Sequence, residues 1–174
     1  MKILAIDQSL SSIGITFFDS KKRAIYFYNF NSHIGSDEPI DRLVYIGYSI
    51  YNVVCKHKPE IVSFEDYAFS QLSSSTTKLA ELVGFIMGSI IKKCKSIDKV
   101  NTLTAAKFLT GSGVRDGKKE RVNFYAKKQI DILKQNDFKI FYEELLCVDD
   151  VSDSYAIALF ILNKINEVPK CLLT

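Results

Sequence analysis

The sequence contains no tryptophan and has only three prolines, two histidines and four cysteines among its 174 residues. The cysteines are Cys55, Cys94, Cys147 and Cys171, and the histidines are His33 and His57. None of the cysteines stands in a C-x-x-C pair, and two histidines are too few to complete a typical zinc site. We therefore expect reduced thiols and a protein of the reducing cytoplasm.

Long apolar runs, linkers and repeats are also absent. No segment is long enough to span a membrane, and Asp7 interrupts the short apolar run at the N-terminus, so we expect neither a membrane segment nor a signal peptide. No Pro-, Gly- or Ser-rich linker separates two parts of the chain, and we expect one domain over residues 1–174. Hydrophobic residues make up 47%, which excludes a disordered chain, and a net charge of +3 does not by itself indicate a nucleic-acid-binding protein.

The pattern of apolar residues predicts an α/β fold. Residues 2–7, 13–18 and 24–30 are predicted to form three strands with tight connections, followed by strands at 60–65 and 99–102. Helices are predicted from about Pro39 to just before Lys58, and over about 78–91, 105–109, 120–134 and 150–165. This order indicates a mixed five-stranded sheet with helices on both faces. Among such folds, the RNase H-like fold is the one that begins with a three-strand meander.

Four acidic residues lie where they could act together: Asp7, Glu65, Asp150 and Asp153. Each also has a structural explanation, because an Asp favours turns, a strand end can be solvated, and acids favour a helix N-terminus. If the first and fourth strands are neighbours, however, Asp7 and Glu65 meet at one edge of the sheet. The three-residue spacing of the last pair puts both carboxylates on one helix face. Crowded carboxylates repel one another, and divalent cations such as Mg²⁺ relieve that repulsion and can support phosphodiester cleavage.

With these residues, the sequence resembles the RuvC family of Holliday junction resolvases, which belongs to the RNase H-like superfamily. The matching segments are Ala5-Ile6-Asp7 before the Gly14 strand, Phe64-Glu65, the Gly111-Ser112-Gly113 loop before Lys118, and the Asp150-x-x-Asp153 helix. The resemblance covers residues 2–164. It implies a homodimeric endonuclease that cuts branched DNA, especially four-way junctions, with Mg²⁺ or Mn²⁺ held by Asp7, Glu65, Asp150 and Asp153.

Three departures from the family pattern resemble phage members more than the cellular enzyme, which suggests the bacterial cytoplasm of an infected host. Gln8-Ser9 stands where many bacterial members have Pro-Gly, the loop is longer by residues 114–117, and Asp149 directly precedes Asp150. The last feature leaves open which of these two aspartates is the ligand. Strict junction selectivity and a preferred cutting sequence are therefore not implied.

The DNA-binding residues are predicted in and around one basic segment, residues 107–128, which carries a net charge of +5. The predicted contacts are Lys107, Arg115, Lys118, Lys119 and Arg121, with Tyr67 and Phe69 stacking on bases beside Glu65. A solvated helix face is the alternative for the charges, and packing on the core is the alternative for the two rings. The apolar helix over 78–91 corresponds to the dimer helix of the family.

Two other functions fit part of the pattern. An ATPase of the actin and sugar-kinase type shares the fold and an early aspartate, but it needs two such domains, and 174 residues without a repeat are too few. A nucleic-acid-binding protein without catalysis would keep the basic segment but would have no need for four acids. Incubation with labelled junction DNA and Mg²⁺, and separately with ATP, distinguishes the three.

Overall fold

The computed structural model describes residues 1–9, 12–31, 38–66, 74–143 and 151–172. Its strands are β1 (Lys2–Gln8), β2 (Ser12–Asp19), β3 (Ala24–Asn31), β4 (Ile61–Glu65), β5 (Ser96–Val100) and β6 (Lys139–Glu143). Its helices are α1 (Pro39–His57), α2 (Ser74–Ile90), α3 (Thr102–Thr110), α4 (Lys118–Gln135) and α5 (Ser152–Lys164), with a short 3₁₀ turn at Lys170–Leu172.

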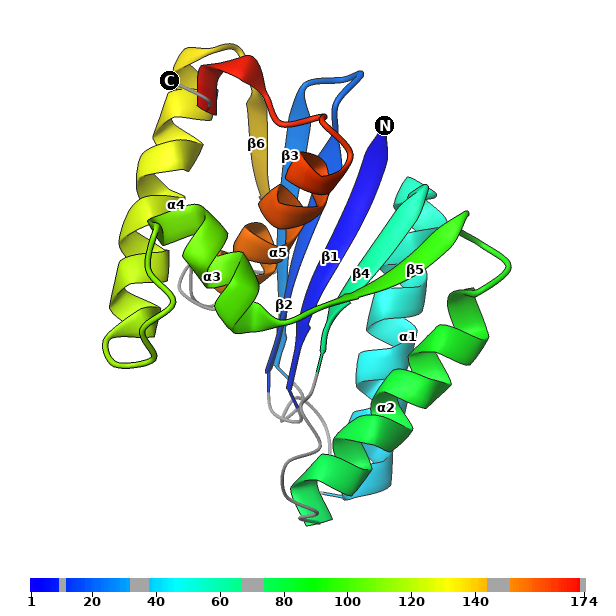
Figure 1. Cartoon of the computed structure of the whole chain (residues 1–174). Coiled ribbons are helices and arrows are strands. Elements are labelled where there is room, and N and C mark those ends of the chain that lie inside the picture. The colour runs from blue at the N-terminus through cyan, green and yellow to red at the C-terminus, as the bar shows by residue number, and fades with distance from the viewer. Residues whose placement is uncertain (10–11, 32–37, 67–73, 144–150, 173–174) are drawn as a thin grey trace.

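The strands form one mixed sheet in the order β5-β4-β1-β2-β3-β6. The antiparallel β1-β2-β3 meander confirms the prediction, and β4 and β5 extend the sheet beside β1 in parallel pairing. Helices α1 and α2 cover one face, whereas α3, α4 and α5 lie on the other (Figure 1). The predicted fold class, with helices on both faces, is therefore confirmed.

The predicted number of five strands was wrong, because the described residues form six. The additional strand, β6, pairs in parallel with β3 at the edge of the sheet. Lys139, Phe141 and Tyr142 of β6 are exposed, and Ile140 and Glu143 are only partly buried. An edge strand with so little burial shows neither the alternation of a half-buried strand nor the continuous apolar run of a central one.

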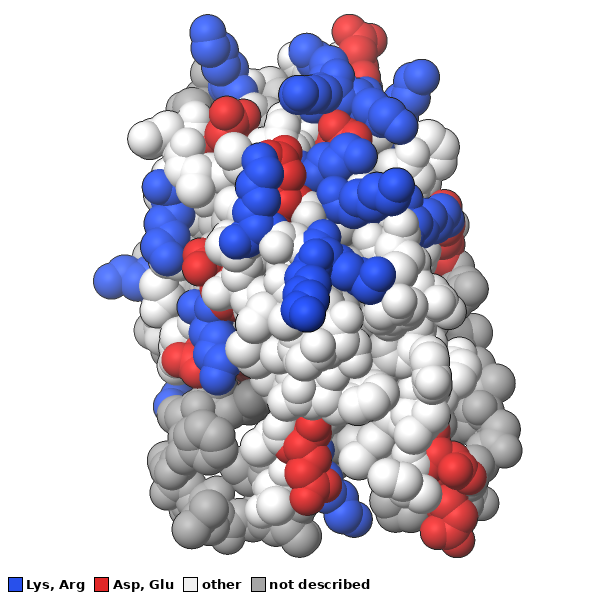
Figure 2. Space-filling model, turned by 90° about the vertical axis from the view of Figure 1, so that its right-hand side faces the viewer, with Lys and Arg blue, Asp and Glu red and all other residues white. Residues whose placement is uncertain are grey.

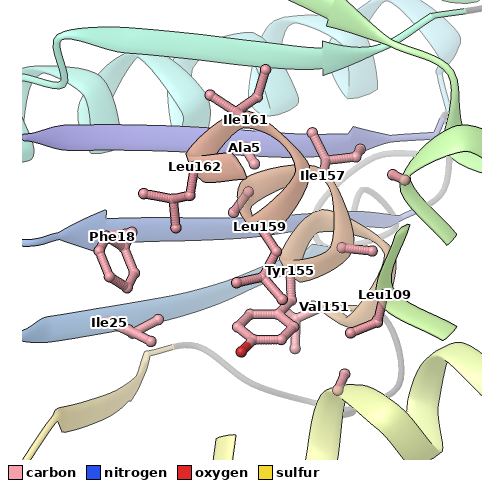
Figure 3. Packing of buried hydrophobic residues seen from close by; sticks show 14 of the residues in the cluster. Ala5, Phe18, Ile25, Leu109, Val151, Tyr155, Ile157, Leu159, Ile161 and Leu162 are labelled. Carbon is pink, nitrogen blue, oxygen red and sulfur yellow. The ribbon is translucent and has the colours of Figure 1, made fainter. Parts of the chain in front are cut away.

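Helix α5 is the centre of one hydrophobic core. The sequence pattern predicted a single apolar stripe, but Tyr155, Ile157, Leu159, Ile161 and Leu162 are all buried, so the helix is covered on nearly every side. It lies between the sheet and helices α3 and α4 (Figure 3). A helix that is apolar all round is one that the core surrounds. The first turn of α5 is therefore held firmly against the sheet.

Three of the four cysteines, Cys55, Cys94 and Cys171, lie in the described part of the chain, and all three are free thiols. Cys147 lies outside the described residues. None of the helices over the described ranges is long and apolar enough to cross a lipid bilayer.

His57, the last residue of α1, is buried against the aromatic side of the sheet. Its ring stacks on Phe17 with a centroid distance of 4.1 Å, and its Nε2 forms a 2.5 Å hydrogen bond with the Tyr28 hydroxyl. Burial, and then the nearby Lys56 ammonium, lower the pKa of His57 to about 4. The imidazole is therefore neutral in the folded protein at neutral pH.

This burial predicts a pH-dependent stability. The unfolded chain takes up a proton at His57 near pH 6.5, whereas the folded chain does so only near pH 4, so the contribution of His57 is complete above pH 6.5 and declines as the pH falls to 4. Between pH 6.5 and pH 4, the free energy of unfolding measured with urea should fall by about 2 kcal/mol more in the native protein than in His57→Gln. Parallel pH profiles for the two proteins would contradict this account.

Candidate active site

Asp7 lies on the α5 side of the sheet because strand side chains alternate. In β1, Leu4 and Ile6 belong to the core beneath α1 and α2, while Ile3 and Ala5 belong to the core around α5. The alternation places the next residue, Asp7, on the α5 side. Gly14, the register partner of Asp7 in β2, adds no side chain beside it.

Glu65 reaches the same side at the end of the neighbouring strand. Val62 and Phe64 of β4 pack toward α1 and α2, so the alternation turns Glu65 toward α5. Strands β1 and β4 are parallel, and Ile6 is the register partner of Phe64. Asp7 and Glu65 are the next pair along the two strands, which end side by side (Figure 1).

Asp153 completes a group of three carboxylates from the first turn of α5. The group raises the pKa of Asp7 well above its usual value: burial is the main cause, followed by the charge of Glu65 and then that of Asp153. A hydrogen bond between the Asp7 and Glu65 side chains acts in the same direction. We call the site formed by Asp7, Glu65 and Asp153 the acidic edge.

Two polar side chains hold Glu65 in place. The buried Gln8 side chain donates from Nε2 to the carbonyl oxygen of Glu65 at 2.8 Å and accepts from the Glu65 N–H at 3.2 Å. Thr102, the first residue of α3, donates its hydroxyl to Glu65 Oε1 at 2.8 Å. The main chain and the carboxylate of Glu65 are thus fixed from two different elements.

Lys118 supplies a positive charge at the acidic edge. Its Nζ lies 3.0 Å from Asp153 Oδ1, and its charge lowers the pKa of Asp7, against the larger effects that raise it. Lys118 begins α4, and its side chain is only 22% exposed. The structure therefore places Lys118 within the acid cluster, whereas the sequence analysis had assigned it to the DNA-binding segment.

The other basic residues predicted to bind DNA differ in their surroundings. Lys107, Arg115 and Lys119 are exposed. Arg121 instead turns back on the loop before α4, donating to the carbonyl oxygen of Asp116 at 2.6 Å and to that of Val114. Lys107, Arg115 and Lys119 are therefore free to face solvent, while Arg121 holds the loop that presents Arg115.

Several predicted site residues lie outside the described part of the chain: Tyr67, Phe69, Asp149 and Asp150. Within the described ranges, no three carboxylate, imidazole or thiol side chains are grouped closely enough to hold a metal ion. Sequence reasoning did not find Gln8 or Thr102. A glutamine directly after Asp7 was a signal for the first, but Thr102 reaches Glu65 only because β5 pairs with β4.

The model of the family described as crossover junction endodeoxyribonuclease RuvC matches residues 3–160. The RuvC protein of Caldicellulosiruptor saccharolyticus is 22% identical over 162 residues, which cover 91% of this chain and 90% of that protein.

Two solved structures share the fold. Thermus thermophilus RuvC, in complex with a Holliday junction substrate, has a TM-score of 0.64 at 13% identity, covering 96% of this chain and 97% of that one. The yeast mitochondrial Holliday junction resolvase has a TM-score of 0.61 at 14% identity, covering 90% of this chain and 75% of that one. Because the family match extends over most of its length and includes the acidic edge, the chain belongs to the RuvC family of crossover junction endodeoxyribonucleases.

Proposed function

We propose that the chain is a metal-dependent endonuclease that resolves four-way DNA junctions and related branched DNA at the acidic edge. The observation that carries this proposal is the meeting of Asp7, Glu65 and Asp153 at one end of the sheet, in a chain that matches the RuvC family. The Thermus thermophilus relative has been solved with a Holliday junction substrate, which supports this class of substrate.

The acidic edge offers the ligand chemistry that a hard divalent cation requires, although its three carboxylates are not grouped closely enough in the described part of the chain to hold one by themselves. Carboxylate oxygens are the ligands that such ions prefer. The pKa of Asp7 is raised first by burial and then by the charges of Glu65 and Asp153, and a bound cation would stabilise its charged form. RuvC-type nucleases depend on divalent metal, and we propose that Mg²⁺, or Mn²⁺ in its place, is held here by Asp7, Glu65 and Asp153, with Asp150 or its neighbour Asp149 as the fourth ligand. When bound, the ion supplies Lewis acidity and a more acidic water.

The chain's own residues orient the site and balance its charge. Gln8 and Thr102 fix Glu65, so its carboxylate keeps one orientation beside Asp7. Lys118 pairs with Asp153 and offers a cation next to the place where a scissile phosphate would lie. Lys107, Arg115 and Lys119 add exposed positive charge for the phosphates of the flanking DNA, and we propose Arg121 as the support of that loop.

The substitution Glu65→Gln tests the metal site. The amide keeps the shape of the side chain but is a much poorer ligand for a hard cation, so junction cleavage with Mg²⁺ should fall by about a thousandfold or more. Binding of the junction in EDTA should be unchanged or tighter, because one negative charge facing DNA is lost. The thermal midpoint of the metal-free protein should not fall, because repulsion with Asp7 is relieved.

Asp66→Asn is the matched control, because Asp66 is the exposed neighbour of Glu65 and its substitution removes the same negative charge. It should cut junctions at close to the native rate. Near-native cleavage by Glu65→Gln, or an equal loss in Asp66→Asn, would remove Glu65 from the site.

The substitution Gln8→Ala tests whether Gln8 positions Glu65. It leaves the N–H and the carbonyl of Glu65 without their side-chain partner, which costs about 1–3 kcal/mol in a buried setting. We expect kcat to fall at least about tenfold while the affinity for junction DNA in EDTA stays within about twofold. Thr102→Val, which removes only the hydroxyl on Glu65, should show the same separation with less loss of stability. Unchanged kcat in both variants would exclude a positioning role.

We further propose that the chain acts as a homodimer through the outer faces of α1 and α2. Several large apolar side chains are exposed there: Ile40, Val44 and Tyr48 on α1 and Phe85 on α2. The Phe85 ring covers Gly47, and together they line a surface hollow of about 300 Å³ with Tyr48, Tyr51 and Ser89. A contiguous apolar surface of this kind is typical of a protein interface, and two copies would cover it symmetrically.

The substitution Phe85→Glu should convert the dimer to a monomer, because it puts a charge on the apolar surface where Phe85 covers Gly47 of α1. Phe124→Glu is the control, since Phe124 is 64% exposed on α4, on the opposite side of the sheet. Light scattering at micromolar concentration measures the mass of each protein. A monomeric native protein, or a Phe85→Glu protein that remains dimeric, would contradict the proposed interface.

A further inference from the structure

A second group of lysines lies away from the basic segment before and within α4. Residues 91–100 contain four lysines and one aspartate, a net charge of +3 that equals that of the whole chain. Lys58, directly after α1, lies nearby. We call this group, which consists of Lys58, Lys92, Lys93, Lys95 and Lys99, the second basic surface.

The fold brings these lysines together from the ends of α1 and α2 and from β5. Lys58 and Lys93 line one surface hollow of about 330 Å³ with Val54 and Cys55. The N–H of Lys95 donates to the carbonyl oxygen of Glu60 at 2.8 Å, which ties the start of β5 to the start of β4. Figure 2 shows the side of the molecule that carries β5 and α2, with Lys and Arg side chains gathered over its upper half.

Little of this charge is neutralised locally. Lys95 pairs with Glu60 at 2.6 Å, but no carboxylate of the described residues forms an ion pair with Lys58, Lys92, Lys93 or Lys99. The helix dipole explains part of the pattern, because cations are favourable at the C-terminal ends of α1 and α2. It does not explain Lys95 and Lys99, which lie at or within strand β5.

The second basic surface extends toward the acidic edge. Strands β4 and β5 are parallel, and each runs from this surface to the edge where Glu65 and its register partner Val100 lie. Five residues of strand span about 13 Å, much less than one turn of duplex DNA at about 34 Å. Ile97 packs toward α1 and α2 and Val100 packs around α5, so Lys99 lies on the α1 and α2 side of β5, the strand at the edge of the sheet, while Glu65 faces α5. A duplex arm that leaves the acidic edge and crosses the outer edge of β5 would meet these lysines within its first turn.

We propose that the second basic surface binds the phosphate backbone of a duplex arm of the branched substrate. This inference rests on the proposed function and adds a contact that the sequence analysis did not contain. Flexible lysines act as point charges that hold phosphates without reading bases. A protein partner fits less well, because protein interfaces are depleted in lysine relative to the rest of the surface.

The test compares the Lys92→Ala/Lys93→Ala double variant with native protein on four-way junctions in EDTA. The control is Lys21→Ala/Lys22→Ala, which removes two exposed lysines from the turn between β2 and β3. The first variant should bind more weakly, and its log–log salt slope should be smaller by about one for each lost phosphate contact. The control should match the native protein in affinity, in salt slope and in the rate of junction cleavage.

A second substrate identifies the partner group. When the phosphates in the first turn of the arms are neutral methylphosphonates, the double variant and the native protein should bind equally. An unchanged affinity and slope on the ordinary junction, an equal loss in the control, or a loss that persists on the neutral arms would overturn the inference. Native protein that does not bind or cut junctions at all would instead contradict the proposed function. Preferential binding of the native protein to vesicles of anionic lipid through Lys92 and Lys93 would overturn the inference and identify a lipid surface as the partner.

Discussion

The repulsion between carboxylates at the acidic edge is the constraint on which the rest of the structure depends. Asp7 and Glu65 end neighbouring parallel strands, and the pKa of Asp7 is raised because burial and two nearby acids oppose its charge. Such a site persists only if the surrounding fold is rigid. Pairing of β1 with β4, the Gln8 contacts with Glu65 and the burial of α5 provide that rigidity. Stability elsewhere in the chain thus maintains an unfavourable charge arrangement that a metal ion can use.

Positive charge is present both within the acidic edge and on exposed residues of α3, of α4 and of the loop between them. Lys118 lies within the cluster, paired with Asp153, while Lys107, Arg115 and Lys119 remain exposed. A lysine inside the cluster reduces the repulsion when no metal is bound, and exposed lysines and arginines attract the polyanionic substrate toward it. This arrangement explains how a chain with a net charge of only +3 can act on DNA, since the charge is local rather than spread over the surface.

Much of the fold and part of the site were predictable from the sequence. The β1-β2-β3 meander and the end of β4 at Glu65 followed from short apolar runs bounded by polar residues, whereas β1 ends at Gln8, one residue beyond the predicted end at Asp7. Strand β6 was missed because it is an exposed edge strand. The burial of α5 on nearly every side was underestimated because the sheet covers one side of the helix and helices α3 and α4 cover the other. The contacts of Gln8, Thr102 and Lys118 depend on strand register and on helix placement, which no local pattern contains.

The central claim is that Asp7 belongs to a metal-dependent site for junction cleavage. Single-turnover cleavage of an end-labelled, immobile four-way junction by native protein and by Asp7→Asn, with Mg²⁺ and with EDTA, tests it most directly. The account predicts symmetrical cuts in opposing strands by the native protein with Mg²⁺ only, and none by Asp7→Asn, which should still bind the junction. Cleavage in EDTA, or near-native cleavage by Asp7→Asn, would contradict it.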